Sequence, residues 1–181
     1  FVHPETVLGQ GAVFADLEKR GACLGLHMHP WKYSMWRYGQ KRYFANYGGL
    51  SADEQRACLA ESAALWREAM GYQPLYFRPG SFSANDDVFR VLAECGFRGG
   101  SCSVPGRVWA DVETVWSGAP PDPHRAHPYF RQACGDLEFA NIPVAGDFSS
   151  HITGAKGRTM HSDLRPDTDW PGKHGISYRT I

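Results

Sequence analysis

Three stretches of the chain repeat one pattern: an amphipathic helix, a glycine, and then a short apolar run. The first predicted helix covers about residues 10–20, where Val13 and Leu17 share one side, and Gly21 follows it. The apolar run "ACLGLHM" at 22–28 comes next. A short apolar run without strict alternation is typical of a strand that is covered on both faces of a parallel sheet.

The second repeat carries the strongest helix signal of the chain. Ser51 and Glu54 form a capping box, which predicts a helix that begins at this point. Its apolar stripe consists of Leu59, Ala63, Trp66 and Met70. Gly71 closes the helix, and the run "LYFR" at 75–78 predicts the second strand.

The third repeat begins at Ser83, which we predict to be the N-cap of a helix. Asp86 and Asp87 would then lie in the first turn, facing the positive end of the helix dipole. Gly96 ends this helix, and "FRGGSCSV" at 97–104 predicts the third strand.

Helices that alternate with apolar runs predict an α/β fold, in which helices cover parallel strands. Three such units fit either an open doubly wound sheet or a barrel. No nucleotide-binding glycine motif follows a strand, which argues against nucleotide folds. Beyond Gly106 the pattern weakens: we expect an ordered loop at 116–130, one more strand region at 137–146, and loop at 147–181. We predict one domain covering 1–181.

The composition excludes several classes of protein. Apolar residues make up 43% of the 181 residues, enough to bury a core. Nineteen basic and 19 acidic residues balance, which argues against nucleic acid or an anionic membrane as the partner. No apolar run approaches the roughly 18 residues of a spanning helix, so we expect no membrane span. Nothing in the sequence indicates an oligomeric state.

The cysteines indicate the cellular compartment of the protein, and the two chain ends indicate whether the sequence is a piece of a longer one. Five cysteines without a pairing signature are expected to be small buried hydrophobes rather than a disulfide framework. That count and the lack of a signal-like segment favour a cytoplasmic protein, and the alternative is a signal segment that stood before Phe1 and was removed. The chain begins at Phe1 instead of Met and ends at Ile181 without a stop signal, which predicts a piece of a longer protein.

Polar residues stand where the predicted strands end. His27 and His29 end the first strand, Arg78 ends the second, and 101–103 end the third. In parallel α/β sheets the chemistry lies at the carboxyl ends of strands. These side chains are therefore expected to lie close together at one edge of the sheet, in a single site.

The two histidines form an HxH motif. Residues two apart in a strand share one face, and two adjacent imidazoles favour the neutral form that binds Zn²⁺, Fe or Ni. Pro30 should end the strand and leave His27 and His29 at its rim. The alternative is a pair of ordinary polar residues at a strand end.

Arg78 is followed by a Pro79-Gly80 turn and the predicted helix start at Ser83. Its guanidinium can hold a carboxylate in bidentate fashion, and the turn amides can stabilise negative charge on a substrate oxygen. The alternative is that Arg78 pairs with a nearby Asp or Glu.

The other histidines give weaker signals. We expect all six to be surface or loop residues: His3, His124, His127, His151, His161 and His174. The "MHSD" segment at 160–163 could supply ligands, but nothing fixes its position. The aromatic residues between Trp31 and Tyr47 suit either sugar rings or an ordered loop that packs on itself.

Two blocks carry a family resemblance. "GACLGLHMHPW" at 21–31 and "LYFRPGSFSANDDVFRVLAECGFRGGSCSVPGR" at 75–107 resemble the polysaccharide deacetylase family, the NodB homology or carbohydrate esterase family 4 fold. They most resemble its branch in bacterial polysaccharide biosynthesis, and the resemblance covers roughly 1–148.

The resemblance implies a deformed (β/α) barrel, with about seven parallel strands in the complete domain. It implies a hydrolase that acts on carbon–nitrogen bonds and removes N-acetyl groups from an amino-sugar-containing glycan or glycan precursor. In the family, one Asp and two His hold a divalent metal, a second Asp is the base, an Arg orients that base, and a later His is the general acid. The implied metal is Zn²⁺, with Co²⁺ or Ni²⁺ as alternatives.

Carried over residue by residue, the resemblance assigns His27 as the first ligand and Arg78 as the orienting arginine. The family's second His falls at Trp31, so His29 must replace it. We expect substrate contacts from Trp31 and from the turn residues Pro79, Gly80 and Ser81. Gly99 and Gly100 replace a family Asp, the Asp pair of the first motif would precede Phe1, and the last motif is not recognisable.

Two further hypotheses stay open. A glycan-binding pseudoenzyme on the same fold would recognise sugar through Trp31 without turnover. Another α/β-barrel metal-dependent amidohydrolase would also place HxH after a strand, with later His and Asp residues as partners, but it gives Arg78 no set role.

Overall fold

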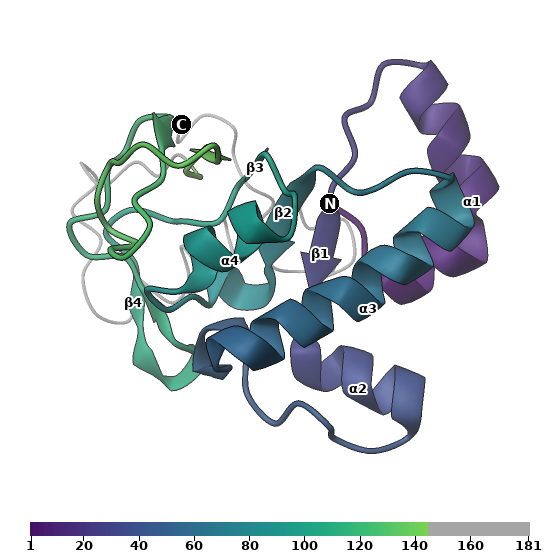
Figure 1. Ribbon diagram of the computed structural model, residues 1–181, viewed down its shortest axis with the longest axis horizontal. Helices are drawn as coiled ribbons and strands as arrows, with labels where there is room; N and C mark the ends of the chain where they lie inside the picture. Colours follow the sequence, from purple (N-terminus) through teal and green to yellow (C-terminus); the bar gives the residue numbers. More distant parts are fainter. Residues whose placement is uncertain (145–181) are drawn as a thin grey trace, which may run out of the picture. The chain divides into compact units, whose positions relative to one another are not determined.

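The computed structural model of the protein describes residues 1–144, which belong to the compact unit Phe1–Ala145 (Figure 1). Its helices are α1 (Pro4–Lys19), α2 (Pro30–Tyr38), α3 (Ala52–Met70) and α4 (Val88–Glu94), with 3₁₀ turns η1 (Tyr47–Gly49), η2 (Gly80–Phe82) and η3 (Ala110–Val112). Its strands are β1 (Leu26–Met28), β2 (Tyr76–Pro79), β3 (Gly99–Gly100), β4 (Val108–Trp109), β5 (Thr114–Val115), β6 (His124–Arg125) and β7 (Ala140–Asn141).

The main sheet has the strand order β1-β2-β3-β7-β6. Its first four strands are parallel, and β6 pairs antiparallel with β7. Val2 adds a parallel bridge to Leu26 on the free side of β1. The α/β class is confirmed, and the mostly parallel sheet with its helices fits the deformed barrel. The antiparallel β6 was not expected, because it lies inside the predicted loop at 116–130.

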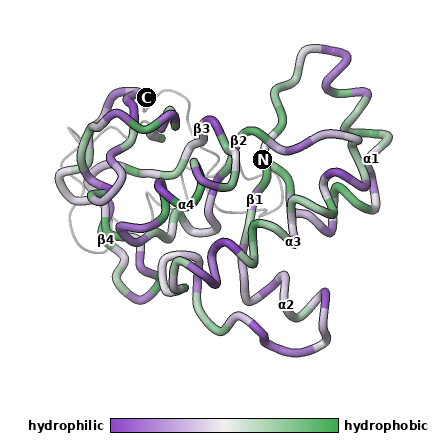
Figure 2. Tube along the Cα trace, in the orientation of Figure 1, coloured by the Kyte–Doolittle hydropathy of each residue, from purple (hydrophilic) through white to green (hydrophobic). Residues whose placement is uncertain are grey.

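Helix α3 confirms the prediction made from its capping box. Ser51 Oγ accepts from the Glu54 amide, and the Glu54 carboxylate accepts from the Ser51 amide. Leu59 and Trp66 on its apolar stripe are fully buried. In Figure 1 α3 runs across the front of β1 and beside α1, and Figure 2 shows hydrophobic and hydrophilic positions alternating along both helices. These helices therefore cover one face of the sheet.

Helix α1 begins earlier than the pattern at 10–20 predicts. It starts at Pro4, and its backbone is non-helical at Gln10, with φ −132°. The first half lacks a clear apolar stripe, so periodicity could not reveal it. Pro4 supplies the start because proline is pre-organised for the first helical position. His3 is thereby the N-cap residue of α1 and not part of a free loop.

Two other predicted boundaries are wrong. Helix α4 does not begin after Ser83, because the Ser83 hydroxyl accepts from the Gly48 amide at 2.9 Å instead of capping a helix. The chain between Ser83 and Val88 therefore stays non-helical. Strand β3 occupies two residues of the predicted 97–104 run.

Helix α2 was not predicted, although the strand end before it was. Strand β1 stops at Met28, and Pro30 is the first residue of α2. Gly39, with φ 66°, closes α2 in the left-handed conformation that glycine adopts without strain. The helix thus begins one residue after His29.

The core and the thiols agree with the sequence in part. Buried apolar side chains from the sheet and from α1, α3 and α4 form one cluster. All five cysteines are free, and Cys58 and Cys102 are buried as expected, but Cys23 and Cys134 are exposed. None of the helices within residues 1–144 is long and apolar enough to cross a membrane. Predictions for 147–181, including His151, His161 and His174, lie outside the described residues, and the single domain 1–181 stays a prediction.

Candidate metal centre

Neighbouring strand ends bring three histidines to one edge of the sheet. His27 lies in β1 opposite Arg78 of β2, and His29 follows the end of β1. His3 follows Val2, whose backbone pairs with Leu26 on the other side of β1. All these positions are at or beyond the carboxyl ends of parallel strands, where the sequence predicts the chemistry.

The three imidazoles form a compact group. One nitrogen from each of His3, His27 and His29 lies within 4.8 Å of the other two. The ring centroids are 4.6 Å apart for His3–His27, 5.0 Å for His27–His29 and 5.5 Å for His3–His29. Within residues 1–144 this is the one group of three or more metal-ligating side chains. The prediction that His3 is a surface or loop residue is therefore corrected.

Burial keeps the three rings neutral. It lowers the pKa of His27 to about 3 and the pKa of His29 to about 4, and mutual repulsion with neighbouring rings adds to both shifts. Burial also lowers the pKa of His3, against the opposing effect of Glu5. Neutral imidazoles have free lone pairs at neutral pH, so the group is ready to bind a cation.

The donor set fits a divalent transition metal. Three imidazole nitrogens suit Zn²⁺, Co²⁺ or Ni²⁺, whereas Mg²⁺ and Ca²⁺ prefer oxygen ligands. Zinc with three protein ligands keeps a position for water or substrate, which is the arrangement of catalytic sites.

His27 is fixed by the neighbouring strand. Its Nδ1 lies 2.9 Å from the backbone carbonyl oxygen of Arg78. A carbonyl oxygen can only accept, so Nδ1 carries the proton and Nε2 keeps its lone pair. Hydrogen bonding of the second ring nitrogen to a carbonyl is a common support for metal-bound histidine.

His29 is supported by a glycine. A Cβ placed on Gly80 would lie 2.2 Å from Nδ1 of His29, so no larger residue fits beside the ring. Gly80 and Pro79 are both buried. The structure thus gives Gly80 a place against a predicted ligand, and the predicted substrate contacts of Pro79 and Gly80 stay predictions.

His3 has an acidic neighbour that sequence reasoning missed. Its Nδ1 lies 3.8 Å from a carboxylate oxygen of Glu5, and both side chains are mostly buried, with 24% and 17% exposed. The other carboxylate oxygen of Glu5 is buried without a hydrogen-bond partner. The signal was the "HPE" triplet after an apolar pair: a strand end, a proline at a helix start, and an acid in the first turn.

Arg78 has no acidic partner in the part of the chain that the structure describes. Its guanidinium lies over the Phe1 ring at 4.5 Å and the Phe82 ring at 5.4 Å, and Nε donates to the Ser101 carbonyl at 3.3 Å. The alternative that Arg78 pairs with an Asp or Glu is therefore wrong for residues 1–144. Burial lowers its pKa, but an arginine stays charged.

The turn after Arg78 is held in an unusual conformation. Ser81 and Phe82 both have φ 55°, in the left-handed region that costs non-glycine residues of order 1 kcal/mol or more. Thr114 Oγ1 donates to the Ser81 carbonyl at 2.6 Å, and Trp116 Nε1 donates to the Phe82 carbonyl at 2.8 Å. These two bonds offset the strain and hold Phe82 on Arg78.

The aromatic residues after His29 divide into two groups. Tyr33, Tyr43 and Tyr47 are buried, as expected for a segment that packs on itself. Trp31 and Trp36 on α2 are 41% and 44% exposed. The packing interpretation is therefore confirmed for the three tyrosines, and contact of the exposed tryptophans with sugar rings stays a prediction.

Comparisons with known proteins add little to this geometry. No family model matches the chain, and no curated protein matches it. A crystal structure of a candidate polysaccharide deacetylase from Mycobacterium smegmatis is similar at 16% sequence identity and a TM-score of 0.43, over 82% of this chain and 53% of that one. The chain spans about half the length of that protein. At these values the similarity by itself establishes no activity for this chain.

Proposed function

We propose that the chain is part of a metal-dependent hydrolase of the polysaccharide deacetylase type, which removes N-acetyl groups from an amino-sugar-containing glycan or glycan precursor. The observation that carries the proposal is the group of three neutral imidazoles at the carboxyl ends of adjacent parallel strands. The blocks at 21–31 and 75–107, which resemble that family, support the choice of reaction.

His3, His27 and His29 would hold the metal. When bound, a divalent cation such as Zn²⁺ polarises the amide carbonyl and makes a water molecule more acidic. The guanidinium of Arg78, whose outer N–H groups have no acidic partner within residues 1–144, would orient a carboxylate near the reacting atoms. The backbone N–H groups of Gly80 and Ser81 would face the oxygen on which negative charge develops.

Acetate release tests the proposal. The zinc-loaded full-length protein should release acetate from N-acetylated oligosaccharides, and His27→Ala should lower the rate by about 100-fold or more, since a metal ligand is lost. His127→Ala is the matched control, because this histidine lies outside the group, beside Tyr129 and Phe130. Acetate release that is equal in wild-type and His27→Ala protein would overturn the proposal.

A second function is favoured by the exposed tryptophans of α2. Trp31 and Trp36 offer ring faces to a sugar within a short distance of His29 along the chain. A glycan-binding protein without turnover would bind oligosaccharide, lose that binding on Trp31→Ala, and release no acetate at any zinc concentration.

A further inference from the structure

Glu5 carries an unsatisfied oxygen beside the histidine group. One carboxylate oxygen, Oε2, is buried and has no hydrogen-bond partner, and 17% of the side chain is exposed. Leaving a buried carboxylate oxygen unpaired is costly, so a donor is expected nearby. Glu5 also lies in the first turn of α1, where the helix dipole favours its charge but supplies no bond to this oxygen.

The imidazole of His3 is the neighbouring group that can donate to this carboxylate. Its Nδ1 is 3.8 Å from Oε1 of Glu5, which is too long for a hydrogen bond but close enough for a small rotation to form one. The backbone holds the two residues together, because Pro4 fixes the start of α1 between them. His3 with Nδ1 directed to Glu5 keeps Nε2 for a metal.

We propose that Glu5 is a positioning residue: its carboxylate accepts the Nδ1–H of His3, so that His3 binds the divalent metal through Nε2. The inference rests on the proposed metal site. His27 already shows the same arrangement, with the Arg78 carbonyl as acceptor at 2.9 Å. A cation on Nε2 strengthens the Nδ1–H donor, so binding should close the gap to Glu5 and satisfy its buried carboxylate.

Zinc affinity tests the role of Glu5. A competition titration with a chromogenic chelator should show Zn²⁺ affinity about 10–100-fold lower for Glu5→Ala than for the wild type. Glu5→Gln should lose less, because its amide oxygen still accepts but carries no charge. Glu68→Ala is the matched control, since this exposed glutamate lies on α3 and should leave affinity unchanged.

Two measurements separate positioning from a purely structural role. A role confined to the helix dipole would lower the melting temperature of the metal-free Glu5→Ala and Glu5→Gln proteins equally and leave zinc affinity unchanged. Nitrogen-15 NMR of the zinc-loaded wild type should show His3 protonated at Nδ1 and coordinated at Nε2. The Nδ1 proton should exchange faster with solvent in Glu5→Ala.

The outcomes distinguish this inference from the proposed function. Zinc that binds the wild type, is lost on His3→Ala and binds Glu5→Ala as tightly as the wild type would overturn the role of Glu5 alone. Coordination of His3 through Nδ1 would do the same. A wild-type chain that binds no zinc would overturn both proposals.

Discussion

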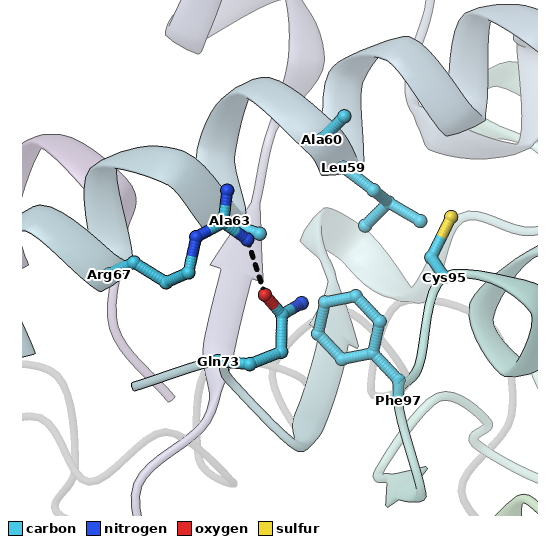
Figure 3. Close-up of a pocket in the computed structure, with 7 residues that line it drawn as sticks. All are labelled: Leu59, Ala60, Ala63, Arg67, Gln73, Cys95 and Phe97. Atoms are coloured by element: carbon cyan, nitrogen blue, oxygen red, sulfur yellow. Dashed lines mark hydrogen bonds between the residues drawn. The ribbon is translucent and has the colours of Figure 1, made fainter. Parts of the chain in front are cut away.

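Two regions at opposite ends of the strands offer a contrast. The histidine group lies at the carboxyl ends of β1 and β2. A pocket of about 240 Å³ lies between α3 and α4, near Gln73 and Phe97, which precede β2 and β3 (Figure 3). It is lined by Leu59, Ala60, Ala63, Arg67, Gln73, Cys95 and Phe97.

The pocket has room and a mostly apolar lining, and its one charged side chain is already hydrogen-bonded. Arg67 donates to Gln73 across it, and burial raises the pKa of Cys95, which keeps the thiol protonated. The histidine group holds neutral rings, one carboxylate oxygen of Glu5 beside it is buried without a hydrogen-bond partner, and the nearby guanidinium of Arg78 has no acidic partner within residues 1–144. The contrast teaches that the proposed site is distinguished by a cluster of three metal-ligating side chains beside an unpartnered carboxylate oxygen, and not by empty volume.

Removal of a metal-ligating histidine should give the largest change in zinc affinity, and a substitution in the pocket should give none. His3→Ala, His27→Ala and His29→Ala, made singly, should each weaken Zn²⁺ binding about 100-fold or more, because each removes one of three nitrogens. Ala60→Leu, which narrows the pocket from an exposed position on α3, should leave zinc binding unchanged. Isothermal titration calorimetry gives both values, and a single His variant with wild-type affinity would remove that residue from the ligand set.

Gly80→Ala should disturb the histidine group without removing a ligand. The new Cβ would lie 2.2 Å from His29 Nδ1, so the ring must move away, and zinc affinity should fall at least about tenfold. Gly9→Ala is the matched control, because nothing lies within 4 Å of its Cβ and the helix α1 should gain up to about 1 kcal/mol. Zinc titration and thermal unfolding of both variants check the pair, and equal zinc affinity in both would contradict the packing role of Gly80.

Arg78→Gln should separate activity from stability. Arg78 makes no ion pair within residues 1–144, so unfolding free energy should change by less than about 1 kcal/mol, while acetate release should fall about 10–100-fold. Arg131→Gln offers the opposite case, since Arg131 pairs with Asp86 at 3.2 Å and its loss should lower stability and spare acetate release. Urea unfolding and rates of acetate release check both variants. A strongly destabilised Arg78→Gln protein with normal turnover would show that Arg78 serves stability and not activity.

The pH dependence of the metal-free protein should give the most gradual effect, because it is spread over about three pH units. Because burial lowers the pKa of His27 and His29 to about 3 and 4, the unfolded chain takes up protons below about pH 6.5 while the folded chain does not. Stability should therefore fall as the pH drops from about 6.5 towards 3. His27→Asn should show a shallower fall in urea midpoints across this window, and an unchanged slope would contradict a buried neutral His27.

Local sequence signals were enough to predict the elements whose ends depend only on neighbouring residues. The capping box of Ser51 and Glu54 predicted α3, and Pro30 predicted the end of β1. The prediction that Ser83 caps a helix was wrong because its hydroxyl accepts from the amide of Gly48, 35 residues earlier in the chain. No local pattern shows such a long-range bond. Sequence therefore predicted the α/β class and the longest helix, but not the boundaries that long-range contacts determine.

In the candidate site, too, the residues marked by local patterns were predicted and those placed by long-range contacts were missed. HxH at a predicted strand end placed His27 and His29 at one edge, and the predicted turn placed Arg78 near them. His3 was missed because α1 begins at Pro4, ahead of the apolar stripe at 10–20. The contact of Gly80 with the His29 ring depends on tertiary packing, so sequence alone had no means of showing it.

The most direct test of the central claim is anomalous diffraction from crystals of the zinc-loaded chain, recorded on both sides of the zinc absorption edge. The account predicts one zinc peak per chain at about 2.0–2.1 Å from one nitrogen of each of His3, His27 and His29. A peak elsewhere, or one that lacks any of the three histidines as ligands, would contradict it.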